Sequence, residues 1–237
     1  MDGDRGPETP AFGLHRKGVL LVGSVGPLLD SVYGALRTAG ASVAVVPGPL
    51  ARSVASPSAP RSRIDQLVGE ATREIGHIEL LVIVLGPADL GPSRMEGAPT
   101  SGSLRDRILL LDTAAAAEFT EQGRAGRIVH VVPAVPPDAA PSAGEHAEVH
   151  AVLGLTQGLA VDLGRHDITV NAVAYGPLEG TVGPDARRAP ADRLERIPKG
   201  RLGRVEDVSS TVVFLCSDEA DYLTGAVLHL DGGHRLT

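Results

Sequence analysis

Short apolar runs alternate with segments of helical periodicity along most of this chain. Apolar runs that end in glycine, such as VLLVGS at 19–24 and LLVIVLG at 80–86, predict buried parallel strands. Similar patterns predict further strands at 39–46, 126–132, 168–176 and 225–233. Helical periodicity predicts a first helix that ends at Thr38 and further helices at 64–76, 104–123, 146–164 and 205–217. Strands that alternate with helices indicate an α/β fold, a doubly wound parallel sheet of the Rossmann type in a single domain.

The two ends of the apolar pattern suggest where this domain begins. Residues 1–16 open with the acidic, Pro- and Gly-rich sequence MDGDRGPETP and carry no apolar signal region. We therefore expect a flexible N-terminal leader over 1–16, an α/β domain over 17–237 and a cytoplasmic protein. No apolar stretch approaches the ~20 residues that a membrane span needs, so no membrane partner is expected.

Composition and charge remove several classes of function. The net charge is −7 and no basic run is present, so nucleic acid is not expected as a partner. A single cysteine, Cys216, excludes a disulfide scaffold and a cysteine-based metal site. The chain has two lysines, Lys17 and Lys199, and three tyrosines. A mechanism that depends on Lys or Tyr therefore has very few candidate residues.

Several ordered segments resemble the short-chain dehydrogenase/reductase family. ITVNAVAYGP at 168–177 resembles the strand and turn that follow the family's catalytic helix, and GRLGRVEDVSSTVVFLCSDEADYLTGAVLHLDGG at 200–233 resembles its last helix and strand. GRIVHVV at 126–132 stands where the strand of the catalytic serine belongs. The resemblance covers about residues 18–237. It implies a Rossmann fold and, in ordinary members, hydride transfer with NAD(P)(H).

The cofactor-binding motifs of the family are altered in this sequence. The family's Gly-x-x-x-Gly-x-Gly motif falls on residues 23–29, where Gly23 matches and Pro27 and Leu29 replace the other two glycines. Gly26 would compensate in part through a shifted turn. The Asn-Asn-Ala-Gly motif keeps Gly86 and loses its asparagines. On this comparison we expect Gly23, Gly26 and Gly86 to be remnants, with weak or absent NAD(P)H binding and no cofactor.

The resemblance also places four catalytic positions, all of which differ here. The family's serine falls on Pro133, its tyrosine on His146 and its lysine on His150, while its asparagine falls near Arg105 or Asp106. Proline has no donor, and imidazole replaces both the phenol and the amine. The family's usual route of hydride transfer is therefore not expected.

Histidines are the main candidates for other chemistry. His146 and His150 are four residues apart on a predicted helix and face the same way, and His130 lies near the end of the preceding strand. Imidazole suits general acid/base catalysis, and Tyr175 would line the pocket as a wall or as a proton donor. Asp89, in the loop after the third strand, could also face the cleft. No metal is expected, since His-Ala-Glu-Val-His is not a metalloprotease motif. A plain polar helix face in an inactive site is the competing interpretation.

Three functions follow from these observations. The first is a cofactor-independent biosynthetic enzyme in a bacterium, which would dehydrate, isomerise or cyclise a polyketide-like small molecule with its pocket histidines. The second is a non-catalytic partner subunit of an active reductase, and the third is an atypical NADP(H)-dependent ketoreductase. Segments 205–217 and 225–233 resemble the family's association surface. We therefore expect a homodimer or homotetramer, or a hetero-oligomer with an active relative.

Overall fold

The computed structural model describes residues 12–47, 60–90, 104–134, 143–180 and 194–237. Within these residues, strands and helices alternate as the apolar pattern predicts. The strands are β1 (Gly18–Gly23), β2 (Ser42–Pro47), β3 (Leu80–Val84), β4 (Gly126–Pro133), β5 (Ile168–Tyr175) and β6 (Val227–Leu230). The main helices are α1 (Pro27–Thr38), α3 (Pro60–Ile75), α4 (Leu104–Glu121), α5 (Ala143–Gly164) and α7 (Val205–Cys216). Expected and observed boundaries agree closely for most elements. The sequence SVASP at 53–57 also suggests a weak strand, and these residues lie outside the described part of the chain.

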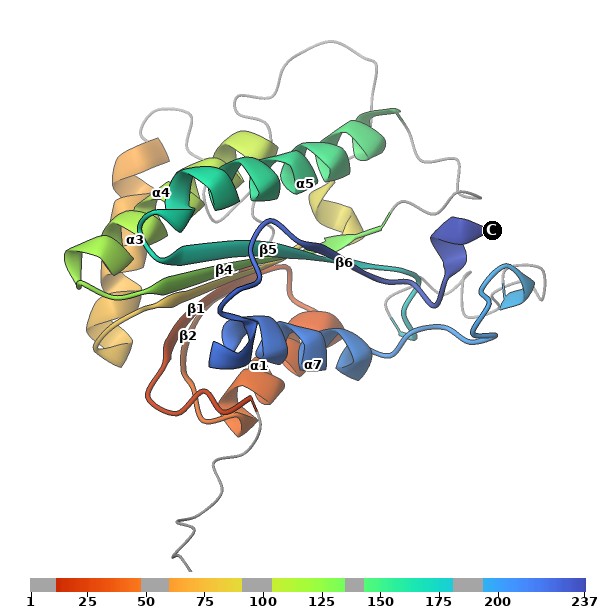
Figure 1. The fold of residues 1–237 in the computed structure, drawn as a ribbon, viewed down its shortest axis with the longest axis horizontal. Coiled ribbons are helices and arrows are strands. Elements are labelled where there is room, and N and C mark those ends of the chain that lie inside the picture. The colour runs from red at the N-terminus through yellow and green to blue at the C-terminus, as the bar shows by residue number, and fades with distance from the viewer. Residues whose placement is uncertain (1–11, 48–59, 91–103, 135–142, 181–193) are drawn as a thin grey trace, which may run out of the picture.

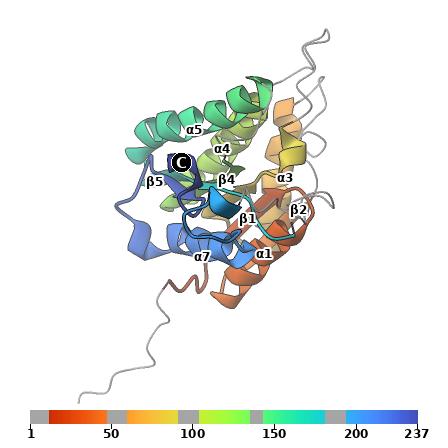
Figure 2. The same ribbon diagram turned by 90° about the vertical axis from the view of Figure 1, so that its right-hand side faces the viewer.

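The described strands form one parallel sheet in the order β2-β1-β3-β4-β5-β6. Helices α3, α4 and α5 cover one face of this sheet, and α1 and α7 cover the other (Figures 1 and 2). The strand order reverses between β1 and β3, which creates a crevice at the carboxyl edge. The prediction of a single doubly wound α/β domain is confirmed.

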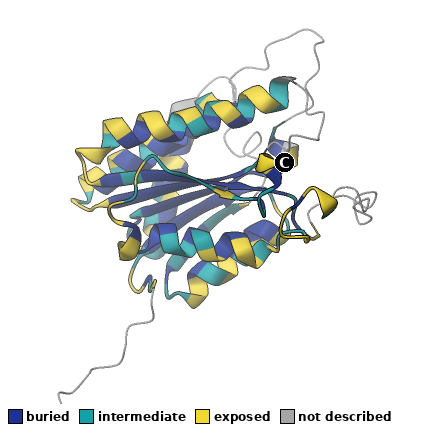
Figure 3. Cartoon of the chain, turned by 45° about the vertical axis from the view of Figure 1, so that its right-hand side comes forward, coloured by how far each residue is buried: buried dark blue, intermediate teal, exposed yellow. Residues whose placement is uncertain are grey.

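The core explains why the strands read as continuous apolar runs. Helices lie on both faces, so every residue of β1 and β3 is buried (Figure 3). Along β4 the side chains alternate: Ile128 and Val132 pack with α3, α4 and α5, and Val129 and Val131 pack with α1 and α7. This two-residue period also fixes the side on which each polar residue of β4 must lie.

The packed domain begins before the boundary expected at residue 17. Residues 1–11 of the expected leader lie outside the described residues. Leu14 is fully buried, and its N–H donates to the carbonyl oxygen of Ala39 over 2.8 Å. The ring of Phe12 meets that of Phe214 edge to face, with 5.4 Å between the centroids. Leu14 and the ring of Phe12, which lie within the expected leader, therefore contact the domain.

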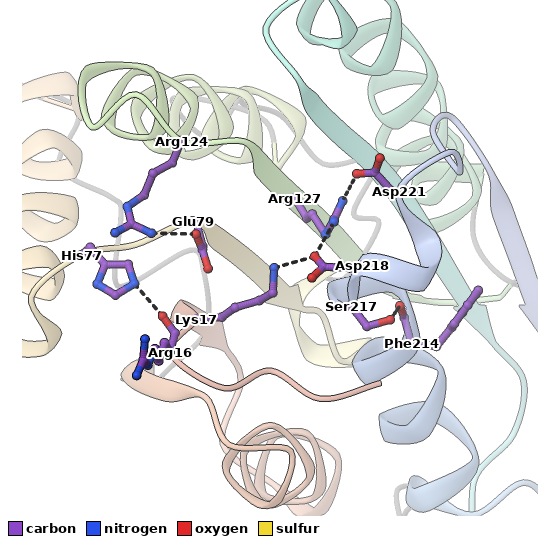
Figure 4. A network of polar contacts seen from close by, with 10 residues as sticks. All are labelled: Arg16, Lys17, His77, Glu79, Arg124, Arg127, Phe214, Ser217, Asp218 and Asp221. Carbon is purple, nitrogen blue, oxygen red and sulfur yellow. Dashed lines mark hydrogen bonds and ion pairs between the residues drawn. The ribbon is translucent and has the colours of Figure 1, made fainter. Parts of the chain in front are cut away.

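A network of ion pairs lies at the amino edge of the sheet, opposite the crevice (Figure 4). Arg127, at the start of β4, keeps only 7% of its side chain exposed and contacts Asp218 at 3.0 Å and Asp221 at 3.1 Å. The ammonium group of Lys17 also contacts Asp218, at 2.7 Å. A guanidinium this deeply buried needs such partners, because an unpaired buried charge is strongly destabilising.

Candidate functional site

A pocket of about 210 Å³ opens at the carboxyl edge of the sheet. Its walls come from residues 24–29 between β1 and α1, residues 84–87 at the end of β3, and Tyr175 at the end of β5. Ligands of open parallel sheets bind in the crevice outside the carboxyl ends of the strands, where the strand order reverses. The pocket therefore occupies the expected place for a small-molecule ligand.

The turn between β1 and α1 is short and is built around Gly26. Gly26 has φ 157° and ψ 178°, a backbone region that is essentially restricted to glycine. No heavy atom lies within 4 Å of the position that a Cβ would take there. The side chains of Leu28 and Leu29 are 6% and 4% exposed and pack into the core. The turn is thus shifted onto Gly26, and the bulk of Leu29 is directed inward.

The N-terminus of α1 faces this turn without a capping side chain. The first helical hydrogen bond runs from the N–H of Asp30 to the carbonyl oxygen of Gly26, over 3.1 Å. The amides of Leu28 and Leu29 precede this bond, and no side-chain hydrogen bond caps the helix. Uncapped amides and the helix dipole together attract anions. This end of α1 is suited to a phosphate group.

Tyr175 forms the wall of the pocket on the β5 side. Its hydroxyl donates to the carbonyl oxygen of Leu85 at the end of β3, over 2.8 Å, and so spans the end of β4 between them. The residue is 5% exposed. Burial and, to a smaller extent, the negative charge of Asp89 raise the pKa of this phenol above its ordinary value. Tyr175 is therefore a hydrogen-bond donor at neutral pH.

Asp89 joins two other walls of the pocket. One of its carboxylate oxygens, Oδ2, accepts from the hydroxyl of Ser24 at 2.6 Å and from the N–H of Gly86 at 2.7 Å. Asp89 is 8% exposed and belongs to the short 3₁₀ turn η1 (Pro87–Asp89). Sequence reasoning placed Asp89 in a loop near the cleft. It did not identify Ser24, because the two residues are 65 positions apart.

His146 and His150 share one helix face, as their spacing predicts. Their rings stack with 5.7 Å between centroids and 11° between planes. Both side chains are exposed, and the Nδ1–H of His150 donates to the carbonyl oxygen of His146 over 2.8 Å. Neither residue lines the pocket described above. The family positions of tyrosine and lysine thus carry surface imidazoles here.

His130 lies in the interior and not at the crevice. It is fully buried between β4, α4 and α5, where Nδ1 lies 2.8 Å from the hydroxyl of Thr156 and Nε2 lies 3.1 Å from Asp112. The structure therefore does not bring the three histidines together. Thr156 and Asp112 were missed by sequence reasoning. A signal existed for Asp112, which interrupts the apolar run at 108–116 of α4.

Two further properties concern only the part of the chain that the structure describes. No group of three His, Cys, Asp or Glu side chains lies close enough together to hold a metal ion. None of the described helices combines the length and the apolar character that crossing a membrane requires.

Comparison with known proteins relates this geometry to a family of enzymes. Residues 59–235 match the family model described as enoyl-(acyl carrier protein) reductase. Sorbitol dehydrogenase of Cereibacter sphaeroides is 31% identical over 232 residues, with 85% of each chain covered. The 3-oxoacyl-[acyl-carrier-protein] reductase of Thermotoga maritima is 32% identical, with 73% of this chain and 72% of the relative covered. An uncharacterized oxidoreductase of Escherichia coli is 38% identical over a shorter stretch, 53% of its own length.

Solved structures agree with the fold. A short-chain type dehydrogenase/reductase from Mycobacterium marinum superposes with a TM-score of 0.78 at 25% identity, covering 95% of this chain and 98% of the other. A gluconate 5-dehydrogenase from Burkholderia cenocepacia, solved with NADP and tartrate, gives a TM-score of 0.73 at 20% identity, with 97% and 99% covered. At this identity the second likeness shows the fold alone.

These relatives correct two expectations. The expectation of a non-redox lyase, isomerase or cyclase is wrong, because the matched relatives are dehydrogenases and reductases. The expectation of no cofactor is contradicted by the same relatives, one of which is an NAD(P)(+)-dependent L-rhamnose 1-dehydrogenase. The physical reason lies in the turn after β1. The sequence comparison assigned its second glycine to Pro27, whereas the structure shifts the turn onto Gly26.

Three kinds of observation now coincide. The order of the described strands and the crevice are those of a doubly wound, nucleotide-binding type of fold. The family model spans residues 59–235, which is most of the chain, and a curated relative at 31% identity covers 85% of it. The motifs at 168–177 and 200–233 occur in the family's order. The chain therefore belongs to the short-chain dehydrogenase/reductase family.

Proposed function

We propose that this protein is an atypical NAD(P)(H)-dependent oxidoreductase that interconverts a hydroxyl and a carbonyl group on a small molecule. One observation carries the proposal: the pocket at the carboxyl edge combines a glycine turn with the uncapped N-terminus of α1. The names of the dehydrogenase and reductase relatives support it. We also propose a cytoplasmic location.

The residues of the pocket fit part of a dinucleotide. The amides of Leu28 and Leu29 would hold the pyrophosphate, and Gly26 would let the backbone approach it. Ser24 and Gly86 would contact the neighbouring sugar. The cavity is smaller than the ~300–1,000 Å³ of sites that enclose a whole drug-sized ligand, so the described residues would hold one portion of the cofactor. When bound, the nicotinamide supplies or accepts the hydride.

Tyr175 is the proposed donor toward the reacting oxygen. Its phenol is protonated at neutral pH, burial raises its pKa still further above the ordinary value, and it already lies in the pocket wall. In this structure the phenol donates its single proton to the carbonyl oxygen of Leu85. When substrate binds, the hydroxyl would turn this proton from Leu85 to the substrate carbonyl and polarise it by donating a hydrogen bond. The family's own donor positions offer less, since Pro133 has no N–H or O–H and His146 and His150 are exposed on α5. This difference makes the proposed site atypical for its family.

Calorimetric titration with NADPH and NADH tests the proposal directly. We expect one of the two to bind with a micromolar Kd, which corresponds to about −8 kcal/mol at 1 μM. Gly26→Leu should abolish this binding, because the new side chain would occupy the space above the turn. Gly34→Leu is the matched control: Gly34 lies on α1, does not line the pocket, and has no heavy atom within 4 Å of the point where a Cβ would lie.

The contrary outcome is also defined. If neither nucleotide binds to the wild type at millimolar concentration, the oxidoreductase proposal fails. If one binds, steady-state assays with polyols, sugar acids and 3-oxoacyl thioesters would then identify the substrate class by the change in nicotinamide absorbance.

We further propose that the protein is a homodimer or homotetramer that associates through β6 and α7. The described part of β6 is an edge strand, and its residues Val227, Leu228 and Leu230 are only partly buried. Light scattering at micromolar concentration should give a mass of two or four times 24.4 kDa. His229→Asp should shift the mass toward the monomer, because exposed His229 lies on this strand, whereas His166→Asp on the α5–β5 turn should not. A monomeric wild type would contradict the proposal.

A further inference from the structure

The pocket contains a link between elements that no local motif requires. The hydrogen bond from the N–H of Gly86 to Asp89 is short-range, since three residues separate the two. The bond from the Ser24 hydroxyl to the same Oδ2 atom is different, because it connects η1 to the turn after β1 across 65 positions. One carboxylate oxygen therefore fixes the spacing between two pocket walls.

We infer that Asp89 is a positioning residue for the cofactor pocket, holding Ser24 and Gly86 at the spacing in which a dinucleotide contacts both. The inference rests on the proposed function. Asp89 itself does not line the pocket, whereas Ser24 and Gly86 do. It would therefore act through these two residues and not by touching the cofactor.

Hydrogen-bond chemistry explains why this link matters. Contacts of 2.6 and 2.7 Å to a carboxylate are short, as expected of charge-assisted bonds. Without Asp89, the short turn that contains Gly26 would lose this side-chain connection to η1. Cofactor binding would then have to order the turn, and the free-energy cost of this ordering would weaken the affinity for the cofactor.

The hydrogen bond between Ser24 and Asp89 also determines which group of the cofactor Ser24 would contact. Its hydroxyl proton is donated to Asp89, so the lone pairs of its oxygen remain available as acceptors. An acceptor beside a carboxylate suits a sugar hydroxyl and disfavours a phosphate. The phosphates would accordingly lie at the amides of Leu28 and Leu29, and a ribose hydroxyl would lie at Ser24.

A double-mutant cycle on cofactor affinity tests the inference. The Kd for NADPH and for NADH is measured by calorimetry for the wild type, Asp89→Ala, Ser24→Ala and the double variant. Each single substitution should raise the Kd about 10- to 100-fold, the usual worth of a hydrogen bond to a charged group. The effects of the two single substitutions should not multiply in the double variant, because both remove the same bond between Ser24 and Asp89.

Conservative and control variants separate positioning from folding. Asp89→Asn keeps an oxygen acceptor and should recover part of the affinity that Asp89→Ala loses. Asp162→Ala removes an exposed acid of α5 and should leave the Kd unchanged. In the protein without cofactor, Asp89→Ala should also speed hydrogen exchange at the Gly86 amide, since this group loses its acceptor.

The possible outcomes distinguish this inference from the function on which it rests. A wild type that binds neither nucleotide overturns both proposals. A wild type that binds, together with an Asp89→Ala variant of equal Kd, overturns the positioning role alone. Effects of Asp89→Ala and Ser24→Ala that multiply in the double variant also overturn it, as does unchanged exchange at Gly86.

Discussion

Tyr175→Phe should lower kcat by about 10²–10³-fold, the usual effect of removing one donor that stabilises charge on a reacting oxygen. The substitution keeps the ring that forms the pocket wall and removes only the hydroxyl. We expect the Kd for the nicotinamide cofactor to stay within a few-fold of the wild type. Steady-state kinetics at saturating cofactor measure kcat, and calorimetric titration measures the Kd.

Loss of the Tyr175 hydroxyl also has a structural effect that must be separated from catalysis. The carbonyl oxygen of Leu85 loses its donor, which costs about 1–3 kcal/mol if the oxygen finds no other partner. Urea unfolding of the variant checks that it remains folded under assay conditions. Tyr33→Phe on the exposed side of α1 is the control and should change neither kcat nor stability. An unchanged kcat in folded Tyr175→Phe would remove Tyr175 from the proposed mechanism.

His130→Ala should lower the free energy of unfolding by about 3–5 kcal/mol, the range for breaking a buried polar pair. His130 and Asp112 have no exposed side-chain surface. Removal of the ring leaves the Asp112 carboxylate buried without this partner and also creates a cavity between β4 and α4. Chemical denaturation monitored by circular dichroism measures the change.

Two comparisons make the His130 result interpretable. His166→Ala removes an exposed histidine from the α5–β5 turn and should change stability by less than about 0.5 kcal/mol. His130→Leu combined with Asp112→Leu replaces both polar groups by apolar ones and should be less destabilising than His130→Ala, since no polar group is left unpaired. A loss below about 1 kcal/mol for His130→Ala would show that the cluster relaxes or admits water.

The sequence was sufficient for the fold because its strands are buried on both faces. Runs such as GVLLVG in β1 and LLVIV in β3 contain no polar side chain, and glycines or polar turns follow them. The helical periodicity of the segments between these strands then indicates a parallel sheet with helices on both faces. The boundary of the domain was less predictable, since only tertiary packing shows that Leu14 is buried.

The site was harder to predict because side-chain direction decides it. His130 lies near the end of β4, but it has the same parity as Ile128 and Val132, which face α4 and α5. Side chains alternate between the two faces of a strand, so this alternation along β4 predicts that His130 lies in the core. The spacing of residues alone could not show that the turn after β1 is centred on Gly26. A turn that is one residue shorter places a different residue against the ligand. The contact between Ser24 and Asp89 depends on the order of the strands and has no sequence signal.

The packing of α1 against α7 has a consequence for how the chain is made. The apolar face of α1, which includes Leu28, Val32 and Leu36, packs with Val208 and Val212 of α7. The Ser31 and Ser209 hydroxyls, 3.0 Å apart, are separated by 178 positions. At ~5–20 residues per second, a ribosome would take roughly 10–35 s to extend the chain from one helix to the other. During that interval the apolar face of α1 lacks its α7 partner, so this part of the core is completed only after the last long helix has been made.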